Sequence, residues 1–259
     1  NVLRPSLIPS LARDVAENLK HERTVRLFEI GHVYLGTDPN LLPKEPSTVA
    51  IAMAGQREAF DRFHTRPADQ GQLDYFDAKG MIDAILDAFT FDDVTWRPLE
   101  HPALHPGRAV EVRADDERIG IVAEVHPTLA VELGIEDMRF AVAELNLQRL
   151  LELAAHIRKP AVSVARFLPV EQDFAIVVDR EVPASNVQRA LTQNAGPLLT
   201  GMALFDVYEG EQIGEGKKSL AYRLTFTAPD RALTDAELGK VRKRIERGIQ
   251  TQVNGSLRA

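Results

Sequence analysis

The sequence predicts an α+β protein with antiparallel sheets, and three observations support this fold class. Segments with period-two apolar residues mix irregularly with segments of helical period, which argues against the repeated strand–helix units of a parallel sheet. Residues 160–259 follow the order strand, helix, strand, strand, helix, strand. The composition, with 44% hydrophobic and 27% charged residues among 259, is typical of a chain with a core of normal size.

In the first part of the chain, helices and strands are predicted in irregular succession. The helix over 77–89 carries an apolar stripe of Met81, Ile85 and Phe89. Residues 56–75 are charged and rich in turn formers, and we expect a loop or a frayed helix there. The predicted helices are 6–20, 77–89, 126–134 and 147–155, and the predicted strands are 25–30, 48–54, 109–112, 119–125 and 140–145.

A boundary predicted near residues 157–160 divides the chain into domains 1–158 and 166–259. The β-α-β-β-α-β order of the second domain is the ferredoxin-like arrangement. A capping box, Thr234–Glu237, predicts the start of the last helix. In this domain the predicted strands are 173–178, 199–209, 219–227 and a short one near Ser256, and the predicted helices are 184–194 and 235–251.

Composition excludes several classes of function. The chain contains no cysteine, so disulfides, thiolate catalysis and cysteine metal sites are excluded. No run of 18 apolar residues predicts a membrane-spanning helix. The chain begins at Asn1 without Met and without a signal-peptide pattern, so we expect it to be a piece of a longer or processed protein.

The charge is unevenly distributed along the chain. The net charge is −7, which is unfavourable for phosphate contacts, but residues 160–259 contain 13 Lys and Arg against 12 Asp and Glu. Any contact with nucleic acid is therefore expected in the second domain. Its last helix carries a cluster of five cations, which is either a solvated helix face or a grip on an RNA backbone: Lys240, Arg242, Lys243, Arg244 and Arg247.

The strongest local signal is the hairpin over 204–226, whose alternation separates two faces. Phe205 and Val207 are expected to face the core, together with Leu220, Tyr222, Leu224 and Phe226. The opposite face presents an aromatic ring, a carboxylate, a hydroxyl and a guanidinium, which suit stacking and hydrogen bonding with unpaired bases. The alternative is an antiparallel hairpin with ordinary surface residues. This opposite face is predicted to hold Asp206, Tyr208, Ser219, Ala221, Arg223 and Thr225.

Short segments of the first part occur together, in the same order, in one known family. They are Asn1–Leu11, Leu27–Gly31, Asp74–Gly80, Leu104–Ala109 and Gly120–Pro127. With the last hundred residues they make the chain resemble the C-terminal part of the β subunit of bacterial phenylalanine–tRNA ligase. The resemblance implies a class II synthetase-like antiparallel sheet core followed by a ferredoxin-fold anticodon-binding domain.

That resemblance also implies a division of labour. The core over 1–158 would be catalytically inactive and would pack on the catalytic α subunit of an α2β2 enzyme. Residues 166–259 would hold the anticodon stem-loop of tRNA(Phe). The complete cytoplasmic enzyme would use ATP and Mg²⁺ on the α subunit, and this chain itself would bind no cofactor. The rival hypotheses are a free-standing RNA-binding or regulatory module and an active single-chain synthetase.

The residues of the first domain support the expected loss of catalytic activity. A class II active site needs a glycine-rich strand–helix segment that ends in an arginine for the γ-phosphate. The corresponding segment here, Phe140–Arg149, contains no glycine that lets a backbone approach the nucleotide. Arg4 and Arg149 are interpreted as structural, and we expect no catalytic residue in this chain.

The family's base-contacting positions match Ala175, Asp206, Tyr208 and Ser219 in this sequence. Alternation independently places all of them on one sheet face. By the resemblance, Tyr208 would stack on an anticodon base, Asp206 would accept a hydrogen bond from one, Ser219 would donate or accept, and Ala175 would leave room. We add three cations on charge grounds: Lys217, Lys218 and Arg223.

Several residues weigh against a further RNA-backbone contact, a metal site or acid–base catalysis. The family often has basic residues just before the first strand of this domain, where this chain has Glu171 and Gln172. His101 and His105 have zincin-like spacing, but Pro102, Pro106 and Gly107 interrupt the segment, so we expect no metal site there or with His126 and Glu124. Glu29, Asp77 and Glu124 are interpreted as structural hydrogen-bond acceptors.

Overall fold

The computed structural model describes residues 3–36, 41–57, 71–89, 91, 94–114, 116–155 and 167–258. The chain forms two compact units, Asn1–Pro160 and Ala161–Ala259, and each is described by itself. Most of the predicted loop over 56–75 lies outside the described residues. In the described part of the chain, none of the helices is long and apolar enough to cross a membrane.

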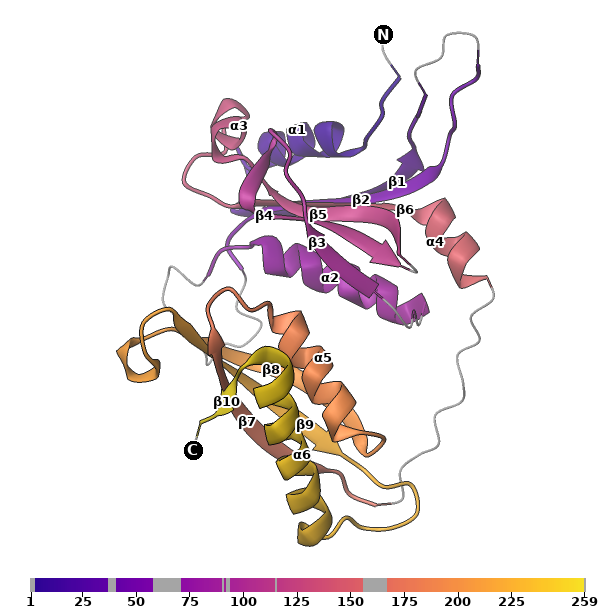
Figure 1. Cartoon of the computed structure of the whole chain (residues 1–259). Coiled ribbons are helices and arrows are strands. Elements are labelled where there is room, and N and C mark those ends of the chain that lie inside the picture. Colours follow the sequence, from indigo (N-terminus) through magenta and orange to yellow (C-terminus); the bar gives the residue numbers. More distant parts are fainter. Residues whose placement is uncertain are drawn as a thin grey trace. The chain divides into compact units, whose positions relative to one another are not determined.

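The first unit is built on one antiparallel sheet of six strands, in the order β1-β2-β6-β5-β4-β3 (Figure 1). β3 was not predicted: it is a short edge strand whose burial does not alternate, so it has no clear sequence signature. The strands are β1 (Thr24–His32), β2 (Ser47–Gly55), β3 (Val94–Pro98), β4 (Leu104–Ala114), β5 (Glu117–Val125) and β6 (Phe140–Asn146). The helices are α1 (Ile8–Asn18), α2 (Tyr75–Phe89), α3 (Pro127–Glu132) and α4 (Leu147–Ala154).

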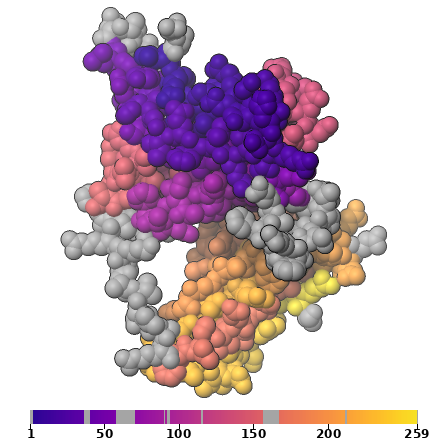
Figure 2. Space-filling view, turned by 180° about the vertical axis from the view of Figure 1, so that it is seen from behind, coloured from indigo at the N-terminus to yellow at the C-terminus, as the bar shows by residue number. Residues whose placement is uncertain are grey.

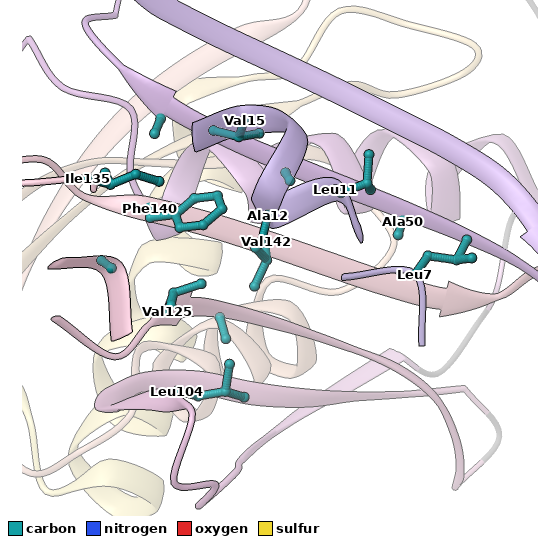
Figure 3. Packing of buried hydrophobic residues seen from close by; sticks show 14 of the residues in the cluster. Leu7, Leu11, Ala12, Val15, Ala50, Leu104, Val125, Ile135, Phe140 and Val142 are labelled. Atoms are coloured by element: carbon teal, nitrogen blue, oxygen red, sulfur yellow. The ribbon is translucent and has the colours of Figure 1, made fainter. Parts of the chain in front are cut away.

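Helices cover both faces of this sheet. On one face, Leu11 and Val15 of α1 belong to the same buried cluster as Phe140 and Val142 of β6 (Figure 3). On the other face, the buried residues of α2 pack with Leu145 of β6. Alternate residues of β6 therefore enter two separate cores. Seen from behind, indigo atoms from the start of the chain make up much of the visible face of this unit (Figure 2).

In the predicted stripe of α2, Ile85 and Phe89 are partly buried against the core, but the fully buried positions lie on the neighbouring stripe. Ala78, Ile82 and Leu86 are buried, whereas Met81 is 42% exposed. Both stripes have helical spacing, and the helix is apolar on both, so periodicity alone does not choose between them. The sheet decides, because the small Ala78 is fully buried and lets the helix pack closely on the strands.

An inward-facing carboxylate ties the start of α1 to the sheet. Glu144 of β6 accepts hydrogen bonds from the backbone N–H of Leu7 at 2.7 Å and from the hydroxyl of Ser6 at 3.0 Å. Burial raises the pKa of Glu144 above its ordinary value. The N-terminus of α1 lacks a side-chain cap from its own N-cap residue. The carboxylate of Glu144, distant in sequence, accepts its hydrogen bonds instead.

The second unit has the predicted β-α-β-β-α-β order and an antiparallel sheet, β10-β7-β9-β8. Two helices pack on one face of this sheet (Figure 1). The predicted capping box is confirmed, because Thr234 and Glu237 each accept from the other's backbone N–H. The strands are β7 (Val170–Asp179), β8 (Leu199–Tyr208), β9 (Lys217–Phe226) and β10 (Ser256–Leu257), and the helices are α5 (Ala184–Ala195) and α6 (Asp235–Val253).

Candidate nucleic-acid interface

The sheet of the second unit has one face turned away from α5 and α6, which we call the open face. Paired residues of neighbouring antiparallel strands place their side chains on the same face. The register therefore brings the four family-matched positions together in two adjacent rows. These rows are Ala175–Ala221–Asp206 and Val177–Ser219–Tyr208.

The helix side of the sheet confirms the predicted alternation of β7 and β9. Every predicted core residue of these strands is at most 2% exposed. Tyr222 donates its hydroxyl hydrogen to the carbonyl of Ala184 at 3.0 Å, and burial raises the pKa of Tyr222 to about 12. The buried set is Phe174, Ile176, Val178, Leu220, Tyr222, Leu224 and Phe226.

The predicted core position of Phe205 is wrong. Leu204 pairs with Tyr222 and Asp206 pairs with Ala221, so Phe205 is an extra residue at a bulge in β8. Its side chain is 53% exposed, and its ring centroid lies 5.3 Å from the guanidinium carbon of Arg223, a residue of the open face. The bulge thus turns a second aromatic ring toward this face.

Val207 keeps its predicted side of the strand but is not buried. It pairs with Leu220, whose side chain is 1% exposed, yet Val207 itself is 52% exposed. β8 lies at one edge of the sheet, so its end receives little cover from the helices. Alternation predicts which side a residue takes, and the extent of the helices decides whether that side is buried.

Arg223 lies on the open face, but a carboxylate balances its charge. It donates two parallel hydrogen bonds to Asp173, at 2.9 and 3.0 Å, and Glu171 lies 3.9 Å away. The hydrogen bond from Arg223 lowers the pKa of Asp173. The guanidinium is therefore fixed in orientation beside Phe205, and it adds little net positive potential.

The two lysines predicted for the site lie on opposite faces of the sheet. Lys217 is exposed and pairs with Asp179, on the side of the open face. Lys218 pairs with Val178, a core residue, and therefore lies on the helix side. Lys218 thus lies on the opposite face from the other candidate site residues, because one residue along a strand reverses the face.

The end of the open face near Ser219 is partly covered. Ser219 is 5% exposed, and the 3₁₀ turn η2 (Glu211–Ile213) contacts β9. From the opposite edge of the sheet, Arg258 donates its backbone N–H to the carbonyl of Ala175 at 2.8 Å and its guanidinium to Gln212 at 3.2 Å. Tyr208 remains 39% exposed, and a side chain at Gly210 would collide with its ring.

All five cations of the basic helix are exposed, and two of them contact other residues of the second unit. Arg244 donates to the carbonyls of Asn194 at 3.1 Å and Ala195 at 2.8 Å, so it caps the carboxyl end of α5. The guanidinium carbon of Arg242 lies 5.2 Å from the ring centroid of Phe174. The remainder of the cluster is Lys240, Lys243 and Arg247.

In the first unit, both arginines interpreted as structural have carboxylate partners. Arg149 makes a bidentate pair with Glu117, at 2.6 and 2.8 Å, and a further bond to Glu152 at 2.9 Å. Arg4 contacts Glu29 at 2.7 Å. The hydrogen bond from Arg149 lowers the pKa of Glu117, as it does for Glu152. Arg149 lines a hollow of about 610 Å³, with its guanidinium held at the wall.

Two family models together match nearly the whole chain. The one described as "Phenylalanyl tRNA synthetase beta chain CLM domain" matches residues 1–147, and "Ferredoxin-fold anticodon binding domain" matches residues 165–258. The chain belongs to the phenylalanyl-tRNA synthetase beta-chain family. In the order of their two domains, the matches agree with the two units of the structure.

Curated relatives of this beta-chain family align along the full chain. The phenylalanine–tRNA ligase beta subunit of Clostridium tetani is 32% identical over 98% of this chain and 30% of its own length. That of Moorella thermoacetica is 36% identical over 100% of this chain and 31% of its own. The chain thus spans about a third of these relatives.

A solved synthetase structure aligns more distantly. Pyrrolysyl-tRNA synthetase from Desulfitobacterium hafniense gives a TM-score of 0.44 at 19% identity, over 59% of this chain and 50% of its own. A TM-score at this level does not establish a common fold.

Three histidines of this beta-chain core accept hydrogen bonds from the backbone. His101, His105 and His126 each accept a backbone N–H from the residue two positions later, at 3.2, 3.1 and 3.3 Å. Glu124 is 3% exposed and accepts from Arg108 and from the backbone of Tyr75. Within the described ranges, no three His, Asp or Glu residues are grouped so that they could hold a metal ion.

Two residues near the beta chain's open face were not predicted from sequence. Phe205 was assigned to the core because nothing in Leu204–Tyr208 marks the bulge. Arg258 had a usable signal, since it follows Ser256 by two positions and alternation places both on one face. The final strand, Ser256–Leu257, is too short to show a period of two.

Proposed function

We propose that this chain is a non-catalytic portion of phenylalanine–tRNA ligase. Residues 1–158 assemble with the catalytic α subunit in an α2β2 enzyme, and residues 166–259 recognise the anticodon stem-loop of tRNA(Phe). The complete cytoplasmic enzyme joins phenylalanine to its tRNA with ATP and Mg²⁺. The observation that carries the proposal is the pair of rows on the open face, which presents Tyr208 and Asp206 beside a floor of small side chains.

The side chains in these rows have complementary roles. The exposed ring of Tyr208 offers a face for stacking, which is worth about 1–3 kcal/mol per base. The exposed carboxylate of Asp206 accepts hydrogen bonds from amino or imino groups of a base and thereby discriminates between bases. Ala175 and Ala221 leave the space in which such a base lies.

Ser219 has a narrower role than the sequence implies. With 5% of its surface exposed, it forms part of the floor beside Tyr208 and offers only the edge of its hydroxyl. Arg223 is committed to Asp173, so we assign it an orienting contact and not a phosphate contact.

The first unit is proposed to be inactive because its residues do not fit ATP. Arg149 is held by Glu117 and Glu152, and approaching a phosphate would require breaking these hydrogen bonds. Packed helices occupy both faces of the sheet, where a synthetase needs an open face for its substrates. We therefore assign ATP and Mg²⁺ to the α subunit.

The first experiment measures binding of the complete chain to a phenylalanine anticodon stem-loop and to one with a changed anticodon. Titrations at 50, 100 and 200 mM salt separate phosphate contacts from base contacts, because only phosphate contacts give a steep salt dependence. We expect tighter binding of the cognate loop at every salt concentration. Equal binding of both loops would contradict anticodon recognition by the open face.

A second experiment tests assembly and inactivity. Co-expression with a phenylalanine–tRNA ligase α subunit should yield a complex on size-exclusion chromatography. The chain alone should show no ATP turnover that depends on phenylalanine and tRNA. Turnover by the isolated chain, absent from a mock preparation, would support an active single-chain synthetase instead.

A further inference from the structure

The open face carries a second aromatic surface on the far side of Asp206 from Tyr208. Along β9, Ser219 is the partner of Tyr208, Ala221 is the partner of Asp206, and Arg223 follows beside Phe205. Arg223 lies four positions after Ser219, which corresponds to about 13 Å of extended strand. The open face thus carries one aromatic ring beside Ser219 and a second beside Arg223.

Phe205 and Arg223 are held in a defined arrangement. The bidentate contact with Asp173 fixes the guanidinium, and the guanidinium in turn lies 5.3 Å from the ring centroid of Phe205. More than half of the Phe205 side chain remains exposed, at 53%. An oriented, exposed ring next to a guanidinium plane is the arrangement on which unpaired bases stack.

The bulge gives this ring its position. Without the extra residue, alternation would point Phe205 toward the helix side, where burying a phenylalanine is favourable. Leu204 and Val207 are also exposed on β8, but their register partners belong to the helix side. Phe205 therefore differs from its apolar neighbours in the face to which it belongs.

We propose that Phe205, supported by Arg223, is a second stacking position for an unpaired base of the RNA strand whose first base stacks on Tyr208. The inference rests on the proposed recognition of a stem-loop and adds a second nucleotide to it. Stacking on a phenylalanine tolerates every base, so this position contributes affinity and direction along the strand. Discrimination stays with Asp206, which lies between the two rings.

The charge balance of Arg223 separates this position from a phosphate contact. Because Asp173 neutralises the guanidinium, removing the Phe205 ring should not change the salt dependence of binding. It should also leave the ratio of affinities for cognate and changed anticodons unaltered. A phosphate-binding residue would instead alter the salt slope.

The test uses the complete chain with Phe205→Leu, which keeps apolar volume but removes the ring, and Phe205→Tyr, which keeps the ring. Val207→Ala on the same strand is the matched control for trimming an exposed apolar side chain. We expect Phe205→Leu to weaken stem-loop binding about 5- to 150-fold at constant salt slope. Phe205→Tyr and Val207→Ala should bind like the unaltered chain.

A fluorescent base analogue locates the contact. With 2-aminopurine placed at successive loop positions, we expect quenching by protein stacking at two positions. Phe205→Leu should relieve quenching at one of them and Tyr208→Leu at the other. Thermal melting of each variant confirms that the fold is intact.

The outcomes distinguish this inference from the function on which it rests. If the unaltered chain prefers the cognate loop but Phe205→Leu binds and quenches like Val207→Ala, the second position is wrong and anticodon recognition stands. If the unaltered chain binds neither stem-loop, both are overturned.

Discussion

Asn194 on α5 occupies the space that a side chain at Gly248 on α6 would need. A Cβ built at Gly248 would collide with the amide group of Asn194, which is itself bonded to the carbonyl of Ala190 at 2.8 Å. The two helices of the second unit therefore approach closely at this point. Glycine is required here for packing and not for backbone conformation.

The contact predicts that Gly248→Ala destabilises the second unit. Overpacking costs about 1–3 kcal/mol, while the higher helix propensity of alanine returns about 1 kcal/mol. We expect a net loss of about 1 kcal/mol in the free energy of urea unfolding. In an Asn194→Ala background the collision is gone, so the same change should become stabilising. Equal effects in both backgrounds would refute the proposed contact.

Tyr222→Phe tests the buried hydroxyl on the helix side of the sheet. Losing the bond to Ala184 should cost about 0.5–1.5 kcal/mol of stability at pH 7. The pKa of Tyr222 is raised to about 12, so the native state keeps a proton that the unfolded state releases near pH 10. The unaltered chain should therefore lose this stability as pH rises from about 10 to 12.

The control for this pH dependence is the variant itself. Tyr75, whose pKa is also raised to about 12, lies in the first unit and is present in both proteins. Denaturation curves at pH 8, 10 and 11 should therefore converge as pH rises. Parallel stability profiles would show that Tyr222 does not titrate as described.

The contribution of Glu237 to stability should depend on pH in the opposite direction from that of Tyr222. Hydrogen bonds from Arg231 and Thr234 lower the pKa of Glu237 to about 2. Its contribution to stability is present above its ordinary value of 4.5 and is lost as pH falls toward 2. Glu237→Gln should reduce stability at pH 7 and make it less sensitive to acid, as followed by denaturation at pH 7, 4.5 and 2.5. Glu246→Gln, at an exposed site on the same helix, should change neither property.

Phe205→Ala should leave the fold nearly as stable as before. An exposed ring beside a guanidinium contributes about 0.5–1 kcal/mol, whereas truncating a buried phenylalanine costs about 3–5 kcal/mol. Phe174→Ala, at a 2% exposed position of β7, provides the buried comparison. Thermal melting should separate the two variants clearly. A large drop in melting temperature for Phe205→Ala would indicate that the Phe205 ring is buried in the core.

Tyr208→Ala should weaken binding of the cognate stem-loop without unfolding the second unit. Losing one base-stacking ring corresponds to about 1–3 kcal/mol of binding free energy. The unfolding midpoint should shift little, because the side chain is 39% exposed. A fluorescence titration together with a melting curve measures both quantities. A strong loss of stability would indicate a packing role for this ring.

Alternation and turn chemistry predicted most of the second unit. The strands β7 and β9 have a clean period of two, and the capping box Thr234–Glu237 marks the start of α6. The face of Ala175, Asp206 and Tyr208 followed from the same period. These signals are local, so the sequence alone is sufficient to find them.

The errors arise where a distant part of the chain decides. The bulge at Phe205 depends on how β8 pairs with β9, and no neighbouring residue indicates the change in register. On α2, the sheet selects Ile82 over Met81 although both belong to apolar stripes. Lys218 is a different case: it was included for its charge, although local alternation along the strand already placed it on the helix side.

The contacts of Arg258 have a practical consequence for handling this protein. The last described residue contacts the β7 strand through Ala175 and the η2 turn through Gln212, so the end of the chain lies beside the open face. A purification tag or fluorophore fused directly after this residue would therefore disturb the surface under study.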